Sequence, residues 1–540
     1  MRNRDYTSRI GGFALAVVMS LVGLSFVPPF ELWAMNFVRV NILSDILAAD
    51  DDLVEYEADI ARLEQELALM NVTQPEVVDT LPEPMPVRYE WIIEEEAVAE
   101  PRLLRSEEVY SPSMMEVVPI EDFDTMAFSR YDRLVEKLAN MEDVRIAFMG
   151  DSFVEGDILT VDLRNELQAL FGGRGVGFVA CDIPFATVRK SVKRTSSGWT
   201  AYSVMKPKST PERLRDRFFV SGYIAEGGAG ATTRWEVTPL YPTLEECSRG
   251  RVLLYSRDTS RLLVEVNDTL TREFEIAGDE SVREIYVEAP IKNLRVRVLD
   301  GRVVCYGASL EGGRGVTVDN FSVRSNNGHA IFGTGAAVNR QIDEMLGYDL
   351  VVLQYGLNIM QPGQRSFSRY RDQLRDMIAY AERCFPDAAI LVLGVSDRWV
   401  KNEETGKYEP IGSVDALTSY QRAAADSAGV AFWNTSRAMA EHGGMPRFVS
   451  NGWAARDYTH INFAGGKRIA EALAMALRRS SGELIAEREA EQERRREAEQ
   501  EAERRREAER QMVIDRNVAA VSGMLEAIAS DVSAINTSEE

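Results

Sequence analysis

Two short stretches of the sequence hold residue types that serve nucleophilic catalysis by a serine. The first is Gly150-Asp-Ser152, which ends an apolar run of strand length that begins at Val144. Open α/β sheets place reactive groups in such turns, at the carboxyl ends of buried strands. The second is Asp457-Tyr-Thr-His460. An aspartate three residues before a histidine can accept a hydrogen bond from Nδ1, which leaves the other ring nitrogen free to take a proton from a serine. In the alternative interpretation, Asp457 caps the next helix and His460 only packs.

Two further polar turns offer hydrogen-bond donors for a developing oxyanion. Gln354-Tyr-Gly-Leu-Asn358 follows another apolar strand, so the side-chain amide of Asn358 is a candidate donor. Val323-Arg-Ser-Asn-Asn-Gly328 follows a strand that contains Asp319-Asn-Phe-Ser-Val, and its backbone N–H groups are candidates as well. Glycine and asparagine are also ordinary turn residues, so these two stretches gain weight only beside the first two.

Strands and helices that alternate along the chain must position these turns. Apolar strands are expected at 144–150, 350–354, 389–393 and 429–433, and helical patterns at 127–140, 159–171, 370–383, 416–427 and 466–477. Such alternation is typical of a parallel sheet with helices on both of its faces.

Residues 186–310 have a different character. They alternate apolar and polar residues with period two, for example in Leu294-Arg-Val-Arg-Val298. Asp300-Gly301 predicts a hairpin between 294–299 and 302–306. We interpret the region as an inserted antiparallel β domain, a sandwich that is either a structural lid or spacer or a carbohydrate-binding module.

The amino-terminal part is expected to anchor and space the protein. Residues 10–30 form an uncharged apolar run that follows Arg2, Arg4 and Arg9, which predicts an uncleaved membrane helix with its amino terminus in the cytoplasm; a cleaved signal peptide is the alternative. Apolar residues at spacings of three and four over 53–70 suggest a short self-associating helix. Residues 71–124 are rich in Pro and Glu and predict a largely disordered spacer.

The net charge of −23 says little about a substrate, because residues 41–124 alone carry 23 acidic and 4 basic side chains. No basic face favours nucleic acid.

In the tail, 483–511 consists almost entirely of Glu, Arg, Ala and Gln, with helix-stabilising pairs such as Glu491/Arg495 and Glu501/Arg505. An RNA-binding arm is disfavoured there because the glutamates cancel the basic field. Apolar residues then step by four and three over 513–535, which predicts a coiled coil that forms a homo-oligomer or docks a partner helix.

Cysteine spacing indicates no metal site. Cys181, Cys247, Cys305 and Cys384 show neither CxxC nor Cys/His spacing. Buried unpaired thiols are the favoured interpretation, and a Cys247–Cys305 disulfide is the alternative. We expect no cofactor.

The four polar stretches occur in the block order of the SGNH (GDSL-like) hydrolases, and the chain resembles that family over about 126–185 and 311–480. The G-x-S-x-G elbow of an α/β-hydrolase is absent, because position 154 is Val. The resemblance implies a flavodoxin-like three-layer α/β fold, with Ser152 as nucleophile, His460 as base and Asp457 as its orienter. It also implies an oxyanion hole made by the backbone N–H of Ser152, the Asn358 amide and a second-block N–H, which belongs to Ser325 or to Gly328.

Together the residues and the resemblance imply a domain order, which we list by number: anchor 1–35, helix and spacer 36–125, catalytic domain 126–185, inserted β domain 186–310, catalytic domain 311–480, and charged helix with coiled coil 481–540. The expected function is a carbohydrate O-acetylesterase in the cytoplasmic (inner) membrane. Its body would lie in the periplasm or outside the cell and act on O-acylated polysaccharide or peptidoglycan. An O-acetyltransferase with the same triad and a non-catalytic envelope scaffold are the rivals.

Overall fold

The computed structural model describes residues 30–32, 35–37, 87–95, 104–109, 117–126, 128–184 and 189–536. Residues 10–29 of the predicted anchor and the predicted helix at 53–70 lie outside these ranges. Within Met1–Thr80, the described elements are β1 (Phe30–Leu32) and β2 (Met35–Phe37), which pair antiparallel. Of the helices in the described ranges, none combines the length and the apolarity that a membrane crossing requires.

A five-stranded parallel sheet forms the centre of the part that is predicted to be catalytic. Its strands are β4 (Val144–Gly150), β14 (Val316–Ser322), β15 (Leu350–Gln354), β16 (Ala389–Leu393) and β19 (Ala431–Trp433). The spatial order is β14-β4-β15-β16-β19, and all neighbours are parallel. In chain order this is 2-1-3-4-5, the flavodoxin-like arrangement, in which the functional crevice lies where the strand order reverses beside the first strand. The prediction of a flavodoxin-like parallel sheet is confirmed.

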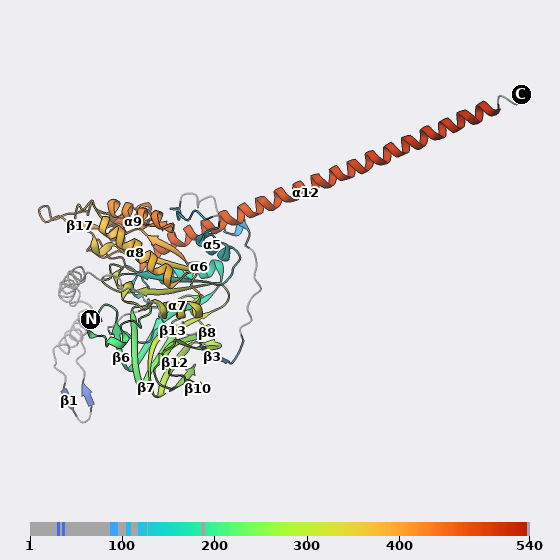
Figure 1. Cartoon of the computed structure of the whole chain (residues 1–540). Coiled ribbons are helices and arrows are strands. Elements are labelled where there is room, and N and C mark those ends of the chain that lie inside the picture. The colour runs from blue at the N-terminus through green and yellow to red at the C-terminus, as the bar shows by residue number, and fades with distance from the viewer. Residues whose placement is uncertain are drawn as a thin grey trace, which may run out of the picture. The chain divides into compact units, whose positions relative to one another are not determined.

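Helices cover both faces of this sheet (Figure 1). Side chains of β4 alternate between two cores: Ile146 and Phe148 face one, Ala147 and Met149 the other. The first core includes apolar residues of α5 (Arg130–Ala139), α6 (Thr160–Phe171) and α12 (Phe463–Asn536). The second includes residues of α7 (Ala336–Leu346), α8 (Ser368–Cys384) and α9 (Val414–Ala428). Smaller helices are α4 (Ser106–Val109), α10 (Thr435–Glu441) and α11 (Gly444–Ser450).

A second, ten-stranded sheet contains the predicted insertion. Its strands are β3 (Val87–Ile92), β5 (Arg174–Ala180), β6 (Val192–Ser203), β7 (Tyr223–Val237), β8 (Cys247–Ser256), β9 (Ser260–Val266), β10 (Leu270–Ile276), β11 (Arg283–Ile291), β12 (Asn293–Asp300) and β13 (Arg302–Gly312). The strands enclose a core of their own. Every pairing is antiparallel except β3 with β11. The antiparallel prediction holds for the insertion, whereas the division of the chain into domains stays a prediction.

The predicted hairpin at Asp300-Gly301 is wrong. β12 and β13 do not pair with each other, although Gly301 has the positive φ of 80° expected in a tight turn. Both strands pair with β7 instead, β12 with its residues 232–236 and β13 with its residues 225–228. The long β7 therefore separates them, because each strand finds a better partner in β7 than in its sequence neighbour.

The prediction of a disordered spacer over 71–124 is wrong for the residues that the structure describes there. β3 adds a strand to the large sheet through parallel pairing with β11. Farther along, Val109 and Val118 are buried in the core beside α5 and α12. Glu121 exchanges backbone hydrogen bonds of 2.9 and 2.8 Å with Phe432. The Pro/Glu-rich composition of 71–124 does not indicate that these few apolar residues pack into the core.

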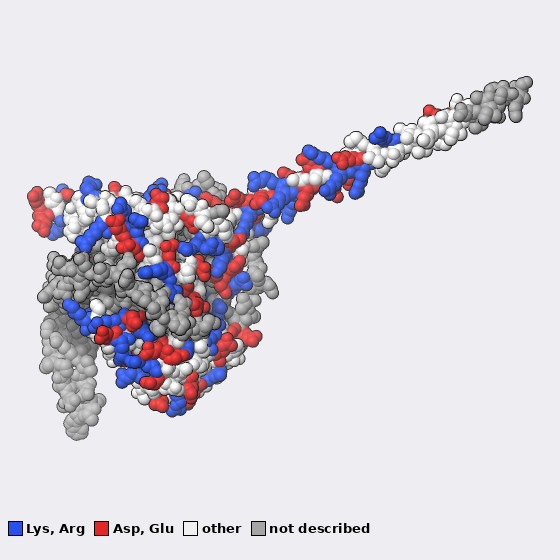
Figure 2. Space-filling model, viewed as in Figure 1, with Lys and Arg blue, Asp and Glu red and all other residues white. Residues whose placement is uncertain are grey.

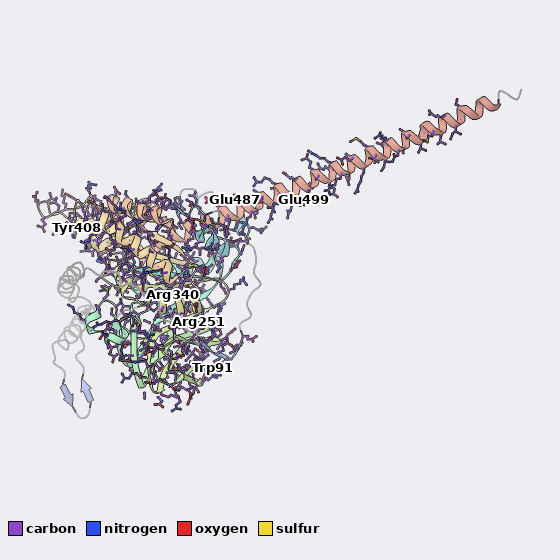
Figure 3. All side chains as sticks on the ribbon, viewed as in Figure 1. Trp91, Arg251, Arg340, Tyr408, Glu487 and Glu499 are labelled. Atoms are coloured by element: carbon purple, nitrogen blue, oxygen red, sulfur yellow. The ribbon has the colours of Figure 1, made fainter. Side chains whose placement is uncertain are left out.

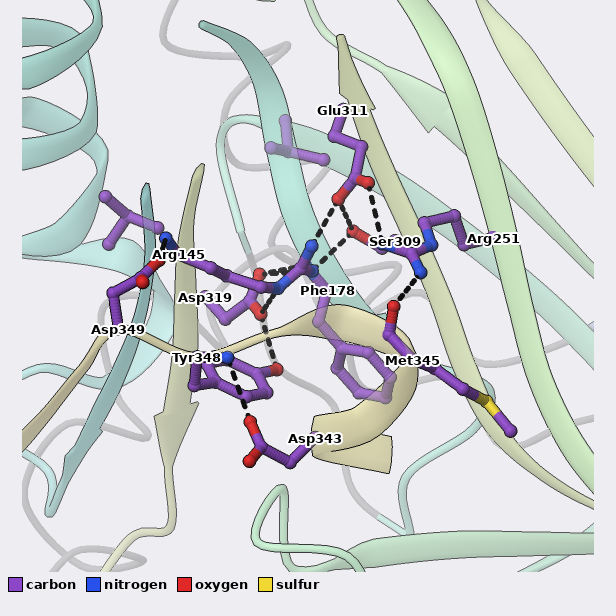
Figure 4. A network of polar contacts seen from close by, with 12 residues as sticks. Arg145, Phe178, Arg251, Ser309, Glu311, Asp319, Asp343, Met345, Tyr348 and Asp349 are labelled. Atoms are coloured by element: carbon purple, nitrogen blue, oxygen red, sulfur yellow. Dashed lines mark hydrogen bonds and ion pairs between the residues drawn. The ribbon is translucent and has the colours of Figure 1, made fainter. Parts of the chain in front are cut away.

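A buried network of charges joins the two sheets (Figure 4). Arg145 of β4 donates to Asp319 of β14 at 2.8 Å and forms an ion pair with Glu311 of β13. Arg251 of β8 bridges Glu311 and Glu284 of β11. Each of these charges has an opposite partner, which is the condition for burying ions at tolerable cost.

The tail is one continuous helix. α12 runs for 74 residues and joins the helix predicted at 466–477 to the charged segment. The predicted pairs Glu491–Arg495 and Glu501–Arg505 are present. Every side chain from 491 to 530 is exposed. Figure 2 shows acidic and basic side chains interleaved on the first part of this exposed stretch and mostly uncharged residues after it. The coiled coil itself stays a prediction.

The four cysteines are buried free thiols, as the favoured interpretation predicted.

Candidate active site

Three of the predicted catalytic turns lie together at the carboxyl-terminal end of the parallel strands. In the register of the sheet, Gly150 at the end of β4 lies opposite Ser322 of β14 on one side and Gln354 of β15 on the other. The turns that contain Ser152, Ser325 and Asn358 therefore leave three adjacent strands at their carboxyl ends. Doubly wound α/β folds position their functional groups at this end of the strands.

The turn after β4 is tight because Gly150 has no side chain. A Cβ there would lie 2.4 Å from Cγ2 of Val154 and 3.0 Å from Oε1 of Gln354. The backbone N–H of Phe153 donates to Oδ1 of Asp151 at 2.9 Å, which folds the chain around Ser152. Ser152 is half-buried, and within the described ranges no group accepts a hydrogen bond from its backbone N–H. This N–H is therefore available to an oxyanion.

His460 is held by Asp457, as the sequence predicts. Nδ1 of His460 lies 2.7 Å from Oδ2 of Asp457, while Oδ1 accepts from the backbone N–H of Thr459 at 2.9 Å and of His460 at 3.0 Å. Because an ionised carboxylate only accepts, Nδ1 carries the proton and Nε2 is the acceptor of the neutral ring. The loop needs a positive φ of 57° at Tyr458 to bring the two side chains together.

Asp457 is not a helix cap. The cap of α12 is Asn462, whose Oδ1 accepts from the backbone N–H of Ala464 at 3.0 Å and of Gly465 at 3.3 Å. The alternative interpretation of Asp457 is therefore wrong, and its carboxylate is free to serve His460.

Electrostatic interactions connect His460 with the Ser152 turn. The hydrogen bond to Asp457 raises the pKa of His460 despite partial burial, and the charges of Asp457 and of Asp151 act in the same direction. Burial acts to raise the pKa of Asp457, but the hydrogen bonds from His460 and from two backbone N–H groups outweigh it and lower the pKa. Asp151 directly precedes Ser152, so this interaction indicates that His460 lies near the turn that contains Ser152.

Asn358 lies in the same neighbourhood. It belongs to the short 3-10 turn Leu357–Ile359, which begins after Gly356. Gly356 has a φ of 118°, a conformation that side chains disfavour. Nδ2 of Asn358 donates to Oδ2 of Asp151 at 3.4 Å and to the carbonyl of Asn326 at 3.3 Å. Both bonds are longer than the usual 2.9–3.0 Å or so, which leaves the amide able to turn to a stronger acceptor.

The turn after β14 distinguishes the two candidates for the remaining donor. The backbone N–H of Gly328 donates to Oδ1 of Asn326 at 2.9 Å and is already engaged. No described residue accepts from the backbone N–H of Ser325. Ser325 has a φ of 62°, a left-handed conformation in which glycine would be unstrained. These observations favour Ser325 as the donor.

The sequence did not point to three neighbours of the site. Asp151 is fully buried, and burial raises its pKa to about 7 against the hydrogen bond from Phe153 and the charge of His460. Asn326 is buried and organises the second turn; both lie inside stretches already singled out, but burial was not visible there. Arg398 acts electrostatically on His460 and donates to the carbonyl of Leu357 at 3.0 Å, and nothing in its sequence context signals this.

A small hairpin packs against the His460 loop. It consists of β17 (Trp399–Lys401) and β18 (Tyr408–Pro410), which pair antiparallel. The ring of Tyr408 stacks on Tyr458 with centroids 4.0 Å apart, and the backbone N–H of Trp399 donates to the carbonyl of Tyr458 at 3.1 Å. Figure 3 labels Tyr408 in this hairpin. The hairpin thus supports the strained residue between Asp457 and His460.

No family model matches the chain, and no curated protein matches it by sequence. Among solved structures, a peptidoglycan O-acetylesterase is 22% identical and aligns over 68% of this chain and 99% of its own, with a TM-score of 0.54. A family two carbohydrate esterase from Cellvibrio japonicus is 11% identical over 45% of this chain and 88% of its own, at a TM-score of 0.18. A lipase/acylhydrolase from Enterococcus faecalis is 13% identical over 30% and 76%, at 0.23. Only the first likeness is close enough to carry an argument, and it concerns the fold alone.

Proposed function

From this SGNH hydrolase-like fold we propose that the protein is a serine esterase that removes O-acetyl or similar small acyl groups from cell-envelope carbohydrate. The observation that carries the proposal is the 2.7 Å contact between His460 and Asp457 in a loop whose histidine interacts with Asp151, the residue before Ser152. A histidine oriented in this way is the base that a weak serine nucleophile requires.

The chemistry would be acyl transfer through Ser152. Nε2 of His460 takes the hydroxyl proton as Oγ attacks the ester carbonyl, and the carbonyl oxygen becomes an oxyanion. The backbone N–H groups of Ser152 and Ser325 and the amide of Asn358 supply its hydrogen bonds. The imidazolium then protonates the leaving sugar hydroxyl, which leaves an acyl-serine. Water, deprotonated by His460, attacks the acyl-serine, releases acetate and returns the proton to Oγ.

The substrate class rests on the likeness to a peptidoglycan O-acetylesterase and on the sequence prediction of an exported body. We place the body outside the cytoplasmic membrane, held by an anchor at 10–30, where O-acylated glycans are the available esters. Protease added to spheroplasts, in which the outer face of the cytoplasmic membrane is accessible, should cut the body but spare the anchor.

We also propose that the end of α12 associates with a second copy of the chain. Its exposed large apolar side chains, listed here from the described residues, support this: Met512, Val513, Ile514, Val518, Val521, Met524, Leu525 and Ile528. Such a contiguous apolar face on an otherwise solvated helix is what a coiled coil buries.

The direct test measures acetate released from O-acetylated peptidoglycan and from p-nitrophenyl acetate by the full chain. The Ser152→Ala variant is compared with Ser419→Ala, which removes an exposed hydroxyl on α9. We expect Ser152→Ala alone to abolish release. Equal release by wild type and Ser152→Ala would refute the proposal. An added glycan acceptor reveals a transferase if acetate appears on the acceptor instead of in solution.

A further inference from the structure

A pocket of about 70 Å³ lies next to the Ser152 turn, where the parallel sheet meets the large sheet. Glu155 and Gly156 line it from the catalytic side, three and four residues after the candidate nucleophile. Three residues span at most about 10 Å, so the pocket is within reach of a saccharide whose ester lies at Ser152. From the large sheet, β6 contributes Arg194 and β7 contributes Tyr223.

Arg194 differs from the other charged groups of the pocket. Nε of Arg189 pairs with the buried Asp157 at 3.0 Å, and Glu155 pairs with Arg324. Arg194 is half-buried, and its guanidinium has neither a hydrogen bond nor an ion pair with any residue in the described ranges. The pocket therefore presents one cation without a direct partner.

A cation removed from water without a partner is unfavourable, and an incoming anion relieves this cost. Burial lowers the pKa of Arg194, and the charge of Asp182 only partly opposes the effect. Oδ1 of Asp182 is engaged by other donors, since it accepts from the hydroxyl of Ser196 at 2.8 Å and from the backbone N–H of Ile183 at 2.9 Å. An arginine in this state is suited to a planar oxyanion, which it can bind through two parallel N–H groups.

We propose that Arg194 binds a carboxylate of the substrate, so that the protein selects esters of acidic saccharides over those of neutral ones. This inference rests on the proposed esterase function and names its substrate class. The volume accommodates the proposed group: about 10–15 Å³ suffices for one water, so a pocket of about 70 Å³ has room for a carboxylate.

The test uses two matched probes: an O-acetylated saccharide with one free carboxylate, and the same saccharide with that carboxylate converted to the amide. Binding of both is measured by calorimetry on the full chain carrying Ser152→Ala, so that no turnover is needed. The same variant is then combined with Arg194→Gln, with Arg194→Lys, or with Lys193→Gln. Lys193 is the exposed neighbour of Arg194 in β6 and serves as the matched control.

We expect the acidic probe to bind roughly tenfold or more tightly than its amide, in line with a charge-assisted hydrogen bond. Arg194→Gln should abolish this preference, Arg194→Lys should keep part of it, and Lys193→Gln should leave it unchanged. Equal binding of the two probes by the Ser152→Ala chain overturns the inference, even if the wild type releases acetate. Loss of the preference in Lys193→Gln as well as in Arg194→Gln also overturns it, because a diffuse field would then explain the selectivity.

Discussion

Nδ1 of His460 and Oδ2 of Asp457 lie 2.7 Å apart, and the second oxygen of Asp457 accepts two backbone N–H groups of the same loop. The carboxylate thus fixes both the fold of the loop and the tautomer of the ring.

Asp457→Asn should therefore lower kcat severely while leaving the fold intact. The amide keeps the shape but no longer favours the proton on Nδ1 or stabilises the imidazolium. Losses in Ser-His-Asp enzymes reach about 10⁴-fold for this change. Steady-state kinetics on p-nitrophenyl acetate measure the loss, and Asp426→Asn on α9 is a control remote from the loop.

The pH profile of activity should follow His460. The hydrogen bond and the charge of Asp457 raise the pKa of His460. The ring therefore becomes a neutral base only at a pH above its usual pKa of about 6.5. We expect kcat/KM to rise with pH through a midpoint above 6.5, and the midpoint to fall in Asp457→Asn. The stability that protonated His460 contributes to the fold has the opposite trend. It is complete below the pKa of His460 in the unfolded chain and is lost as the pH rises through the pKa of His460 in the folded protein. A midpoint that the Asp457→Asn change does not move would contradict the assignment.

Asp151→Asn tests the buried carboxylate beside Ser152. Because burial raises the pKa of Asp151 from 3.8 to about 7, the folded state favours its protonated form. Its contribution to stability is therefore complete below about pH 3.8 and declines as pH rises through 7. The variant should lose this decline, so that its melting temperature exceeds that of the wild type more at pH 8 than at pH 5. Parallel curves for both proteins from pH 5 to 8 would show that Asp151 does not titrate in this range.

Asn358→Ala should reduce kcat by about 10²–10³-fold, the usual effect of losing one oxyanion donor. KM should change little, because the donor acts mainly in the transition state. Asn327→Ala, in the neighbouring turn, is the control; its side chain accepts from the backbone N–H of His329 at 3.0 Å. An equal decrease of kcat in both variants would indicate a structural cause.

Ser325→Gly should retain activity, since the backbone N–H is unchanged. Glycine also adopts the φ of 62° without the cost of about 1–2 kcal/mol that a side chain incurs there. Greater freedom of the unfolded chain offsets part of this gain, so we expect a net stabilisation of at most about 1 kcal/mol in urea unfolding. A hundredfold loss of activity would instead assign a role to the Ser325 hydroxyl.

Removal of residues 513–540 should convert the proposed oligomer into a monomer without changing the specific activity. Apart from Met512, the exposed apolar face of α12 lies in this segment, far along the helix from its cap Asn462. Light scattering measures the mass. Ala508→Ser, outside the apolar face, serves as a control that keeps the mass of the wild type.

Local sequence patterns predicted four strands of the parallel sheet well, because β4, β15, β16 and β19 are largely apolar runs, whereas β14 carries polar residues such as Asp319 and Asn320. Inference from the local sequence also predicted that Ser152 and Asn358 lie at strand ends and that Asp457 pairs with His460. It failed for β12 and β13, because their common partner β7 lies more than 50 residues away in the chain. It also missed the buried state of Asp151 and the electrostatic action of Arg398, since both depend on which segments pack together.

Strand β3 covers an edge of the large sheet by pairing with β11, although it lies about fifty residues before β4 in the chain. A shortened protein that begins at 126 would lose β3 and leave the backbone of β11 uncovered along six paired residues. It would also remove Arg88, which lies 2.6 Å from the buried carboxylate of Glu284. An uncovered strand edge is a template for aggregation. The soluble fragment of this protein must therefore begin before residue 87, at a point where composition alone suggests only a dispensable linker.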